Sequence, residues 1–309
     1  RVLIISSLIL LASFLFFMLF NSNGNWDFIL PFRGKKLLLL LTVAYTIGVS
    51  TLLFQTLTNN PILTPSILGF DSLYLLLQTV LVFLLGGLGF TQLPIANKFA
   101  FETLLMLGAA LLLFRTLTKD NADIARMLLI GVVFGVFFRS VNNLLQRMID
   151  PEEFAVAQSS SFASFNSANP TLLTIGIIIA LLSSIWIWTQ RHKLDVLMLG
   201  KHKAIGLGIN YNRFSHQLLI CCALLVSVST ALVGPILFLG LLVCAIVNSI
   251  SPTMQHAIRI PLTFIISAIT LVLGQAVFEQ LFKLQGVLSV VIEFLGGIVF
   301  IYLMLKKQK

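Results

Sequence analysis

Charged residues are scarce in this chain. Asp, Glu, Lys and Arg make up 10% of the 309 residues, whereas apolar residues make up 58%. A soluble domain carries about 25% charged residues, and a fold of this length cannot bury so much apolar surface in one core. The composition therefore argues against a soluble enzyme, a disordered chain and a nucleic-acid-binding protein. It predicts a protein whose solvent is the lipid bilayer.

Residues that bind metals or carry redox chemistry are also few. The three cysteines, Cys221, Cys222 and Cys244, lie in apolar stretches, and the sequence has no Cys-x-x-Cys or His-x-x-x-His spacing. We interpret them as small apolar side chains in helix packing. The four histidines fall in predicted loops or at the ends of apolar runs, where we expect solvated side chains without a catalytic role. No metal site is predicted.

Motifs of catalysis and nucleotide binding are absent from the sequence. It contains no Gly-x-x-x-x-Gly-Lys-Ser/Thr, no His-Glu-x-x-His and no Gly-x-Ser-x-Gly. Without a phosphate-binding loop the chain cannot cradle ATP phosphates itself. Without a nucleophile motif it does not read as an intramembrane hydrolase. We therefore expect a protein that is not an enzyme and that binds no cofactor.

Long apolar runs fill most of the chain. A run of about 20 apolar residues spans the hydrocarbon core as a helix. Short polar segments divide the sequence into ten such runs, at residues 2–20, 37–57, 67–90, 99–117, 127–148, 172–188, 217–233, 236–250, 261–282 and 288–305. The eighth is too short to cross squarely. We interpret the first as a span and not as a removed signal peptide. The fold class is thus all-α, a single transmembrane domain over residues 1–309 with about ten helices.

The basic residues indicate the orientation. If the N-terminus is inside, 13 of the 20 Lys and Arg residues fall on the inner side and five on the outer side. Because cationic loops stay in the cytoplasm, both termini are predicted to be cytoplasmic. Two connections are longer than turns: residues 150–170 would lie outside and carry a short surface helix, and the basic segment 190–216 would lie inside as a helix and turn.

Four ionisable residues fall within or near predicted spans: Asp71, Glu102, Arg139 and Glu293. Charges in a bilayer are costly and often functional. Arg139 could pair with Glu293 for structural reasons, or the four could form an ion relay or line a substrate path. If the four residues form an ion relay, the alternative function is an ion-coupled secondary transporter.

A polar pattern crosses the second run and the segment after it. It reads Arg33-Gly-Lys-Lys36, then Ser50-Thr51-x-x-x-Gln55, then Asn60-Pro61-x-x-x-Pro65-x-x-Leu68-Gly69. Physically, the prolines end one helix and re-aim the chain into the next, and Gly69 allows a tight turn. The pattern resembles the FecCD family, the permease subunits of ABC importers for ferric siderophores, haem and vitamin B12.

Three further blocks resemble the same family in the family's order. Leu194-Asp195-x-Leu197-x-Leu199-Gly200-x-x-x-Ala204-x-x-Leu207-Gly208 is similar to its cytoplasmic coupling segment. The stretch from Gly234 to Val243 is similar to its G-x-I-x-F-x-G-L pattern. The end of the chain from Glu293 is similar to the closing helix of the branch that serves anguibactin, petrobactin and catecholate siderophores.

The resemblance implies a type II ABC importer permease that moves an iron–siderophore complex, of catecholate type, across the bacterial inner membrane. ATP would be bound by two copies of a separate ATPase subunit, and a second permease subunit, in a heterodimer, would complete the path. A periplasmic siderophore-binding protein would dock outside at Arg33 and Lys36. The resemblance implies that ATPase coupling falls to Leu199, Gly200, Lys201, Lys203, Ala204, Leu207 and Gly208, and the path or its hinge to Gln55, Asn60, Pro61, Pro65 and Gly69.

The chain departs from the family pattern at several positions. Thr51 stands at a family glycine, Lys201 at an acidic position, Cys244-Ala245 at a Pro-His pair and Asn248 at an arginine. The roles of those family groups therefore do not carry over. The outer motif has Lys35 and Lys36 in place of proline and a second arginine, so we expect Arg33 and Lys36 to form exposed, salt-screened pairs.

Overall fold

The computed structural model describes residues 2–20, 26–118, 124–159, 165, 169–281 and 288–307. Within them every regular element is helical, which confirms the all-α class. The elements are α1 (Val2–Leu19), α2 (Trp26–Thr58), the 3₁₀ turn η1 (Pro65–Leu68), α3 (Phe70–Gln92), α4 (Ile95–Thr118), α5 (Ile124–Gln146), α6 (Pro151–Ser159), α7 (Pro170–Leu197), α8 (Lys201–Gly206), α9 (Tyr211–Val233), α10 (Leu239–Ile250), α11 (His256–Ala276), the π-helical turn η2 (Val277–Leu281) and α12 (Leu288–Lys307).

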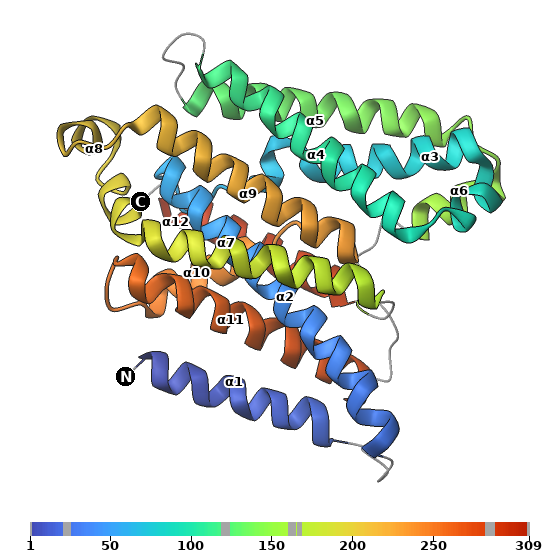
Figure 1. Ribbon diagram of the computed structural model, residues 1–309, viewed down its shortest axis with the longest axis horizontal. Helices are drawn as coiled ribbons and strands as arrows, with labels where there is room; N and C mark the ends of the chain where they lie inside the picture. The colour runs from blue at the N-terminus through green and yellow to red at the C-terminus, as the bar shows by residue number, and fades with distance from the viewer. Residues whose placement is uncertain are drawn as a thin grey trace.

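The long helices run roughly side by side along one direction, as a bundle that crosses a bilayer must (Figure 1). Among the described residues, eight helices are long and apolar enough to span. Each of the ten predicted runs coincides with a helix. The eighth run is short as expected, since α10 has only 12 residues. The irregular stretch before it, residues 234–238, is covered by protein, which is the condition for non-helical backbone at membrane depth.

Helix α2 is the centre of the bundle. It packs along α11, α9, α10 and α7, and the middle of the helix is buried. Its small polar residues satisfy their hydroxyl groups within the helix: Thr46 donates to the Thr42 carbonyl at 3.0 Å and Ser50 to the Ile47 carbonyl at 3.1 Å. This lets neighbouring helices approach closely without leaving a buried donor unpaired.

The outer helices carry the lipid-facing surface. Helix α1 lies at one edge of the bundle, and α3, α4 and α5 lie at the opposite edge (Figure 1). Their outward side chains are large and apolar, as the bilayer prediction requires. Exposed examples are Ile4, Leu8, Leu84, Leu88, Leu104, Leu112, Leu129 and Val133.

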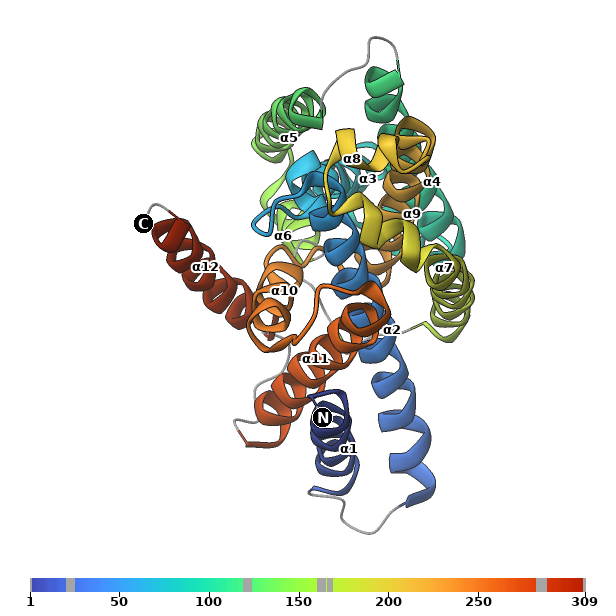
Figure 2. The ribbon, with the colours of Figure 1, turned by 90° about the vertical axis from the view of Figure 1, so that its left-hand side faces the viewer.

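Two short helices mark the two ends of the bundle. Helix α6 forms the surface helix expected between residues 150 and 170, and α8 lies at the other end (Figure 1). The start of α1 and the end of α12 lie at the same end as α8, and both face the viewer when the molecule is seen from that end (Figure 2). The sequence predicted an even number of membrane crossings, which puts the two ends of the chain on the same side of the bilayer.

Close packing of α10 on α2 leads to the first prediction. A methyl group on Gly240 would overlap the Thr51 side chain, whose Cβ would lie 2.8 Å away. Gly240→Ala is therefore expected to lower the free energy of unfolding by about 1–3 kcal/mol. Thr51→Gly alone is expected to lose about 1–3 kcal/mol, because it empties a buried side-chain site and places glycine in a helix. In the double variant the overlap is gone, so its loss is smaller than the sum.

A double-mutant cycle measured by unfolding in detergent checks this prediction. Losses that simply add would mean that Thr51 and Gly240 do not limit how closely α10 approaches α2.

Candidate functional site

The end of α2 turns the chain sharply toward α3. Thr58 is the last helical residue, and Asn59 adopts the left-handed conformation with φ of 51°, which often ends a helix. The Asn60 side chain accepts a hydrogen bond from the Ile62 backbone N–H at 3.1 Å. Gln55 donates its side-chain N–H to the Pro61 carbonyl at 2.7 Å. The helix break predicted at Asn60 and Pro61 is present. Gln55, one of the predicted path residues, stabilises it through this hydrogen bond.

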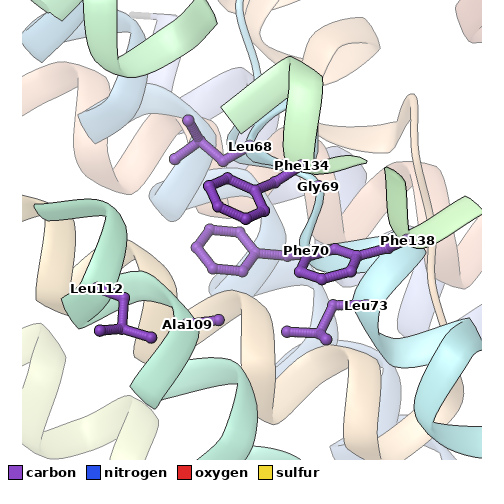
Figure 3. Close-up of a pocket in the computed structure, with 8 residues that line it drawn as sticks. All are labelled: Leu68, Gly69, Phe70, Leu73, Ala109, Leu112, Phe134 and Phe138. Atoms are coloured by element: carbon purple, nitrogen blue, oxygen red, sulfur yellow. The ribbon is translucent and has the colours of Figure 1, made fainter. Parts of the chain in front are cut away.

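The start of α3 fits tightly against α5. Pro65 opens η1, and Gly69 follows it with φ of 85°. A side chain on Gly69 would lie 2.7 Å from the Gly135 Cα, so glycine is required here both by conformation and by space. Beside this turn lies an apolar cavity of about 260 Å³, around which the rings of Phe70, Phe134 and Phe138 gather (Figure 3). The tight turn predicted at Gly69 is confirmed, and its function as a hinge stays a prediction.

The predicted coupling segment forms a compact helical turn after α7. Gly200 precedes α8 with φ of 95°, and Gly208 follows it with φ of 85°. Ala204 is fully buried, at 0% exposure, and anchors α8 to the bundle. Leu207 is 62% exposed and lies beside the exposed Lys203, so an apolar and basic face points away from the protein.

The rest of the coupling set lies around this face. Leu199 is exposed, Lys201 is half-buried and Lys201 Nζ lies 5.7 Å from the centre of the Tyr211 ring. Gly200 lies next to the end of α2: a Cβ placed on it would be 3.8 Å from Asn59 Nδ2. The structure thus brings the coupling segment against the turn that contains the predicted path residues.

A buried histidine joins three helices at this point. His256, the first residue of α11, is 0% exposed. Its backbone N–H and its Nδ1 each lie 2.7 Å from Asp195 Oδ1 on α7, and its Nε2 lies 2.9 Å from Thr56 Oγ1 on α2. The expectation of solvated histidines is wrong for this residue. Its burial depends on tertiary packing that the local sequence does not reveal.

Arg259, one turn further along α11, also faces the bundle. It is one of the 13 basic residues predicted on the inner side of the membrane, yet it is only 5% exposed. Its Nη2 donates to the Asn248 side-chain oxygen on α10. Asn248 is the position at which the family pattern has arginine, so α11 supplies a guanidinium at that place. Arg259 lines a cavity together with Gln55 and Asn60.

The two residues predicted to dock a binding protein are engaged within the chain. Arg33 is half-buried and donates to the carbonyls of Phe17, Met18 and Phe20 at the end of α1, at 2.8–3.0 Å. Lys36 forms an ion pair with Glu279 and is 7% exposed. The expected exposure of Lys36 is therefore wrong, because η2 brings a carboxylate over it. Docking through these residues stays a prediction.

The four intramembrane ionisable residues do not form one chain of contacts. Glu102 pairs with Lys98 at 3.9 Å and accepts from Gln78. Asp71 hydrogen-bonds Ser66 and interacts electrostatically with both Arg139 and Glu293, and the Glu293 carboxylate accepts from the Leu237 backbone. In the part of the chain that is described, no ion pair joins Arg139 to Glu293, so of the alternatives left open by the sequence the direct pairing is not formed. The same part contains no cluster of three metal-binding side chains.

The hydrogen bonds that join His256 to Asp195 and Thr56, here called the histidine junction, give the second prediction. Asp195→Ala leaves two donors of His256 unpaired in a buried position, which is expected to cost about 1–3 kcal/mol of stability. Asp195→Asn keeps an acceptor and is expected to lose less. Thermal unfolding of the detergent-solubilised chain measures both variants. If Asp195→Ala unfolds at the temperature of the wild type, the junction does not hold the helix ends together.

Comparison with known proteins agrees with this geometry. The model of the FecCD transport family matches residues 2–306. The chain is 47% identical to the petrobactin import system permease protein YclO of Bacillus subtilis, over 94% of this chain and 93% of that protein. It is 33% identical to the petrobactin import system permease protein FatC of Bacillus anthracis, over 89% and 78%.

A solved structure has the same fold. A metal-chelate type ABC transporter in an inward-facing conformation superposes with a TM-score of 0.85 at 21% identity, covering 99% of this chain and 98% of that one. Membership of this family overturns the ion-coupled secondary transporter as the alternative. The chain belongs to the FecCD transport family, and it is a multi-pass membrane permease subunit of an ABC importer, not an enzyme.

Proposed function

We propose that this permease moves an iron–siderophore complex of the catecholate type across the cytoplasmic membrane of a bacterium. The petrobactin permeases among its relatives support this substrate class. Iron is cargo here, carried within its chelate, and the permease holds no cofactor of its own. ATP is bound and hydrolysed by a separate ATPase subunit, present in two copies.

The observation that carries the mechanism is the contact between the coupling segment and the end of α2. Gly200 lies against Asn59, and His256 ties Asp195 on α7 to Thr56 on α2. When the ATPase subunits close and displace α8, these contacts pull the turn at Asn60 and Pro61 with it. Rigid helices and buried hydrogen bonds pass such a displacement on, because a packed core does not deform continuously. The path opens or closes without covalent chemistry.

A second permease subunit completes the path, and we propose a heterodimer. Arg139 is exposed on α5 in the single chain, although it lies within a span. A guanidinium at that depth is unfavourable against lipid, so a partner or an aqueous path covers it. Helix α12 also indicates that a second subunit packs against this chain, since α12 packs mainly on α10 and stands apart from the other helices (Figure 2).

The orientation follows from the basic residues and the position of α8. Both termini lie at the α8 end, which we place in the cytoplasm. The end with α6 and the start of α2 then faces outside, where a siderophore-binding protein docks. Arg33 is the more accessible of the two predicted docking residues, and Lys36 contributes only if it leaves Glu279.

The third prediction tests the coupling face. Leu207→Asp places a charge on an exposed apolar residue and is expected to lower both ATPase capture and iron uptake by at least tenfold, as loss of a central interface residue does. Met148→Asp is the matched control for ATPase capture, because Met148 is also an exposed apolar residue but follows α5 at the opposite end of the bundle, which is the outer end in this proposal. The measurement is affinity purification from iron-starved membranes with mass spectrometry, together with uptake of labelled iron.

The wild type is expected to capture an ATPase and a second permease. A wild-type chain that purifies alone would contradict the proposed function. If Leu207→Asp captures as much ATPase as Met148→Asp and the wild type do, the ATPase docks elsewhere.

A further inference from the structure

The cavity between the coupling segment and the end of α2 contains a buried charge. It has a volume of about 320 Å³ and is lined by Gln55, Asn59 and Asn60 from the end of α2, by Asn248 of α10 and by Arg259 of α11, among others. Four of these five side chains are amides and one is a guanidinium, and Met198 and Met254 add apolar surface. Polar groups therefore gather in a partly apolar cavity, at the point where the predicted path meets the coupling segment.

Arg259 has no anionic partner in the part of the chain that is described. Its Nη2 donates to Asn248, its Nη1 contacts only the Met198 sulfur at 3.7 Å, and its Nε has no hydrogen-bond partner. No described carboxylate forms an ion pair with it. A guanidinium that is 5% exposed and unpaired is strongly unfavourable unless an anion joins it.

Gln55 adds a second unsatisfied group to the same cavity. Its side-chain N–H is used by the Pro61 carbonyl at 2.7 Å, but its Oε1 has no partner. The Asn59 and Asn60 side chains beside it carry N–H donors. A guanidinium among amide donors suits a carboxylate or phenolate oxygen, because hydrogen bonds to charged acceptors are the strong ones. The Gln55 oxygen can accept from a protonated or hydrated group of the same ligand.

We propose that this cavity is an anion site that holds a negatively charged oxygen of the iron chelate at the inner end of the path. This inference rests on the proposed function and adds a specific residue, Arg259, to it. A ferric ion held by catecholate dianions carries a net negative charge, which the guanidinium offsets. The cargo fits better than an acid of the ATPase, because Arg259 is buried beneath the turn whereas the ATPase meets the exposed face around Leu207.

The test measures chelate binding to the full transporter, with its second permease and ATPase, in lipid nanodiscs. Two probes are titrated: a ferric catecholate complex, which is an anion, and a ferric trihydroxamate complex, which is not. The anionic probe is expected to bind the wild type more tightly than the other. Arg259→Gln is expected to weaken binding of the anionic probe by about tenfold to a hundredfold and to leave the other unchanged. Arg259→Lys is expected to retain part of the affinity.

Arg213→Gln is the matched control, since it removes an exposed cation from the cytoplasmic start of α9, outside the cavity. It is expected to bind both probes as the wild type does. Because Arg259→Gln removes an uncompensated charge, the empty variant is expected to unfold at a temperature no lower than that of the wild type. If Arg259→Gln does not fold, the wild-type measurement alone tests the inference: equal affinity of the wild type for the two probes overturns it.

The remaining outcomes separate this inference from the proposed function. If the wild type binds the anionic probe and Arg259→Gln binds it equally well, only the anion site is overturned. If Arg259→Gln keeps its chelate affinity but loses the ATPase, an acid of that subunit is the partner of Arg259, and the anion site is likewise overturned. If the wild type binds neither chelate and captures no ATPase, the proposed function fails as well.

Discussion

The hydrogen bonds of His256 are the interaction on which the account of this permease depends. One imidazole ring joins Asp195 at the end of α7 to Thr56 near the end of α2, and its backbone N–H fixes the start of α11 to the same carboxylate. All of these bonds lie where the predicted coupling segment begins. Three helix ends are thus held as one unit, so in the proposed mechanism a displacement of α8 reaches the turn that contains Asn60 without a long chain of intermediates.

The bilayer explains how the rest of the fold supports this unit. The middle of α2 is buried, and its own small residues such as Ser50, together with Gly240 of α10, allow the neighbouring helices to pack closely on it, so in the proposed mechanism it can transmit movement. The irregular stretch before α10 survives at membrane depth because Glu293 accepts from the Leu237 backbone and Gly296 lets α12 approach it. Glu293 therefore stabilises the backbone before α10, a structural role that differs from the ion relay considered from the sequence.

Local pattern predicted much of the fold but little of the site's inner contacts. Apolar runs, prolines and Gly69 act through nearby backbone, so the ten helices, the short α10 and the break at Pro61 could be read directly. Burial of His256, Lys36 and Arg259 could not, because each depends on a group distant in sequence: Asp195, Glu279 and Asn248. Ala204 belongs to the predicted coupling set, yet only the structure reveals that it anchors α8 rather than presenting a surface.

The most direct test of the central claim is the number of iron chelates transported per ATP hydrolysed when the junction is opened. The measurement uses the reconstituted transporter with Thr56→Val, which removes the α2 end of the link but keeps the size of the side chain. The account predicts that ATP hydrolysis continues while iron transport falls several-fold, so the ratio drops. An unchanged ratio, with both activities kept or both lost together, would contradict the claim that His256 connects the coupling segment to the path.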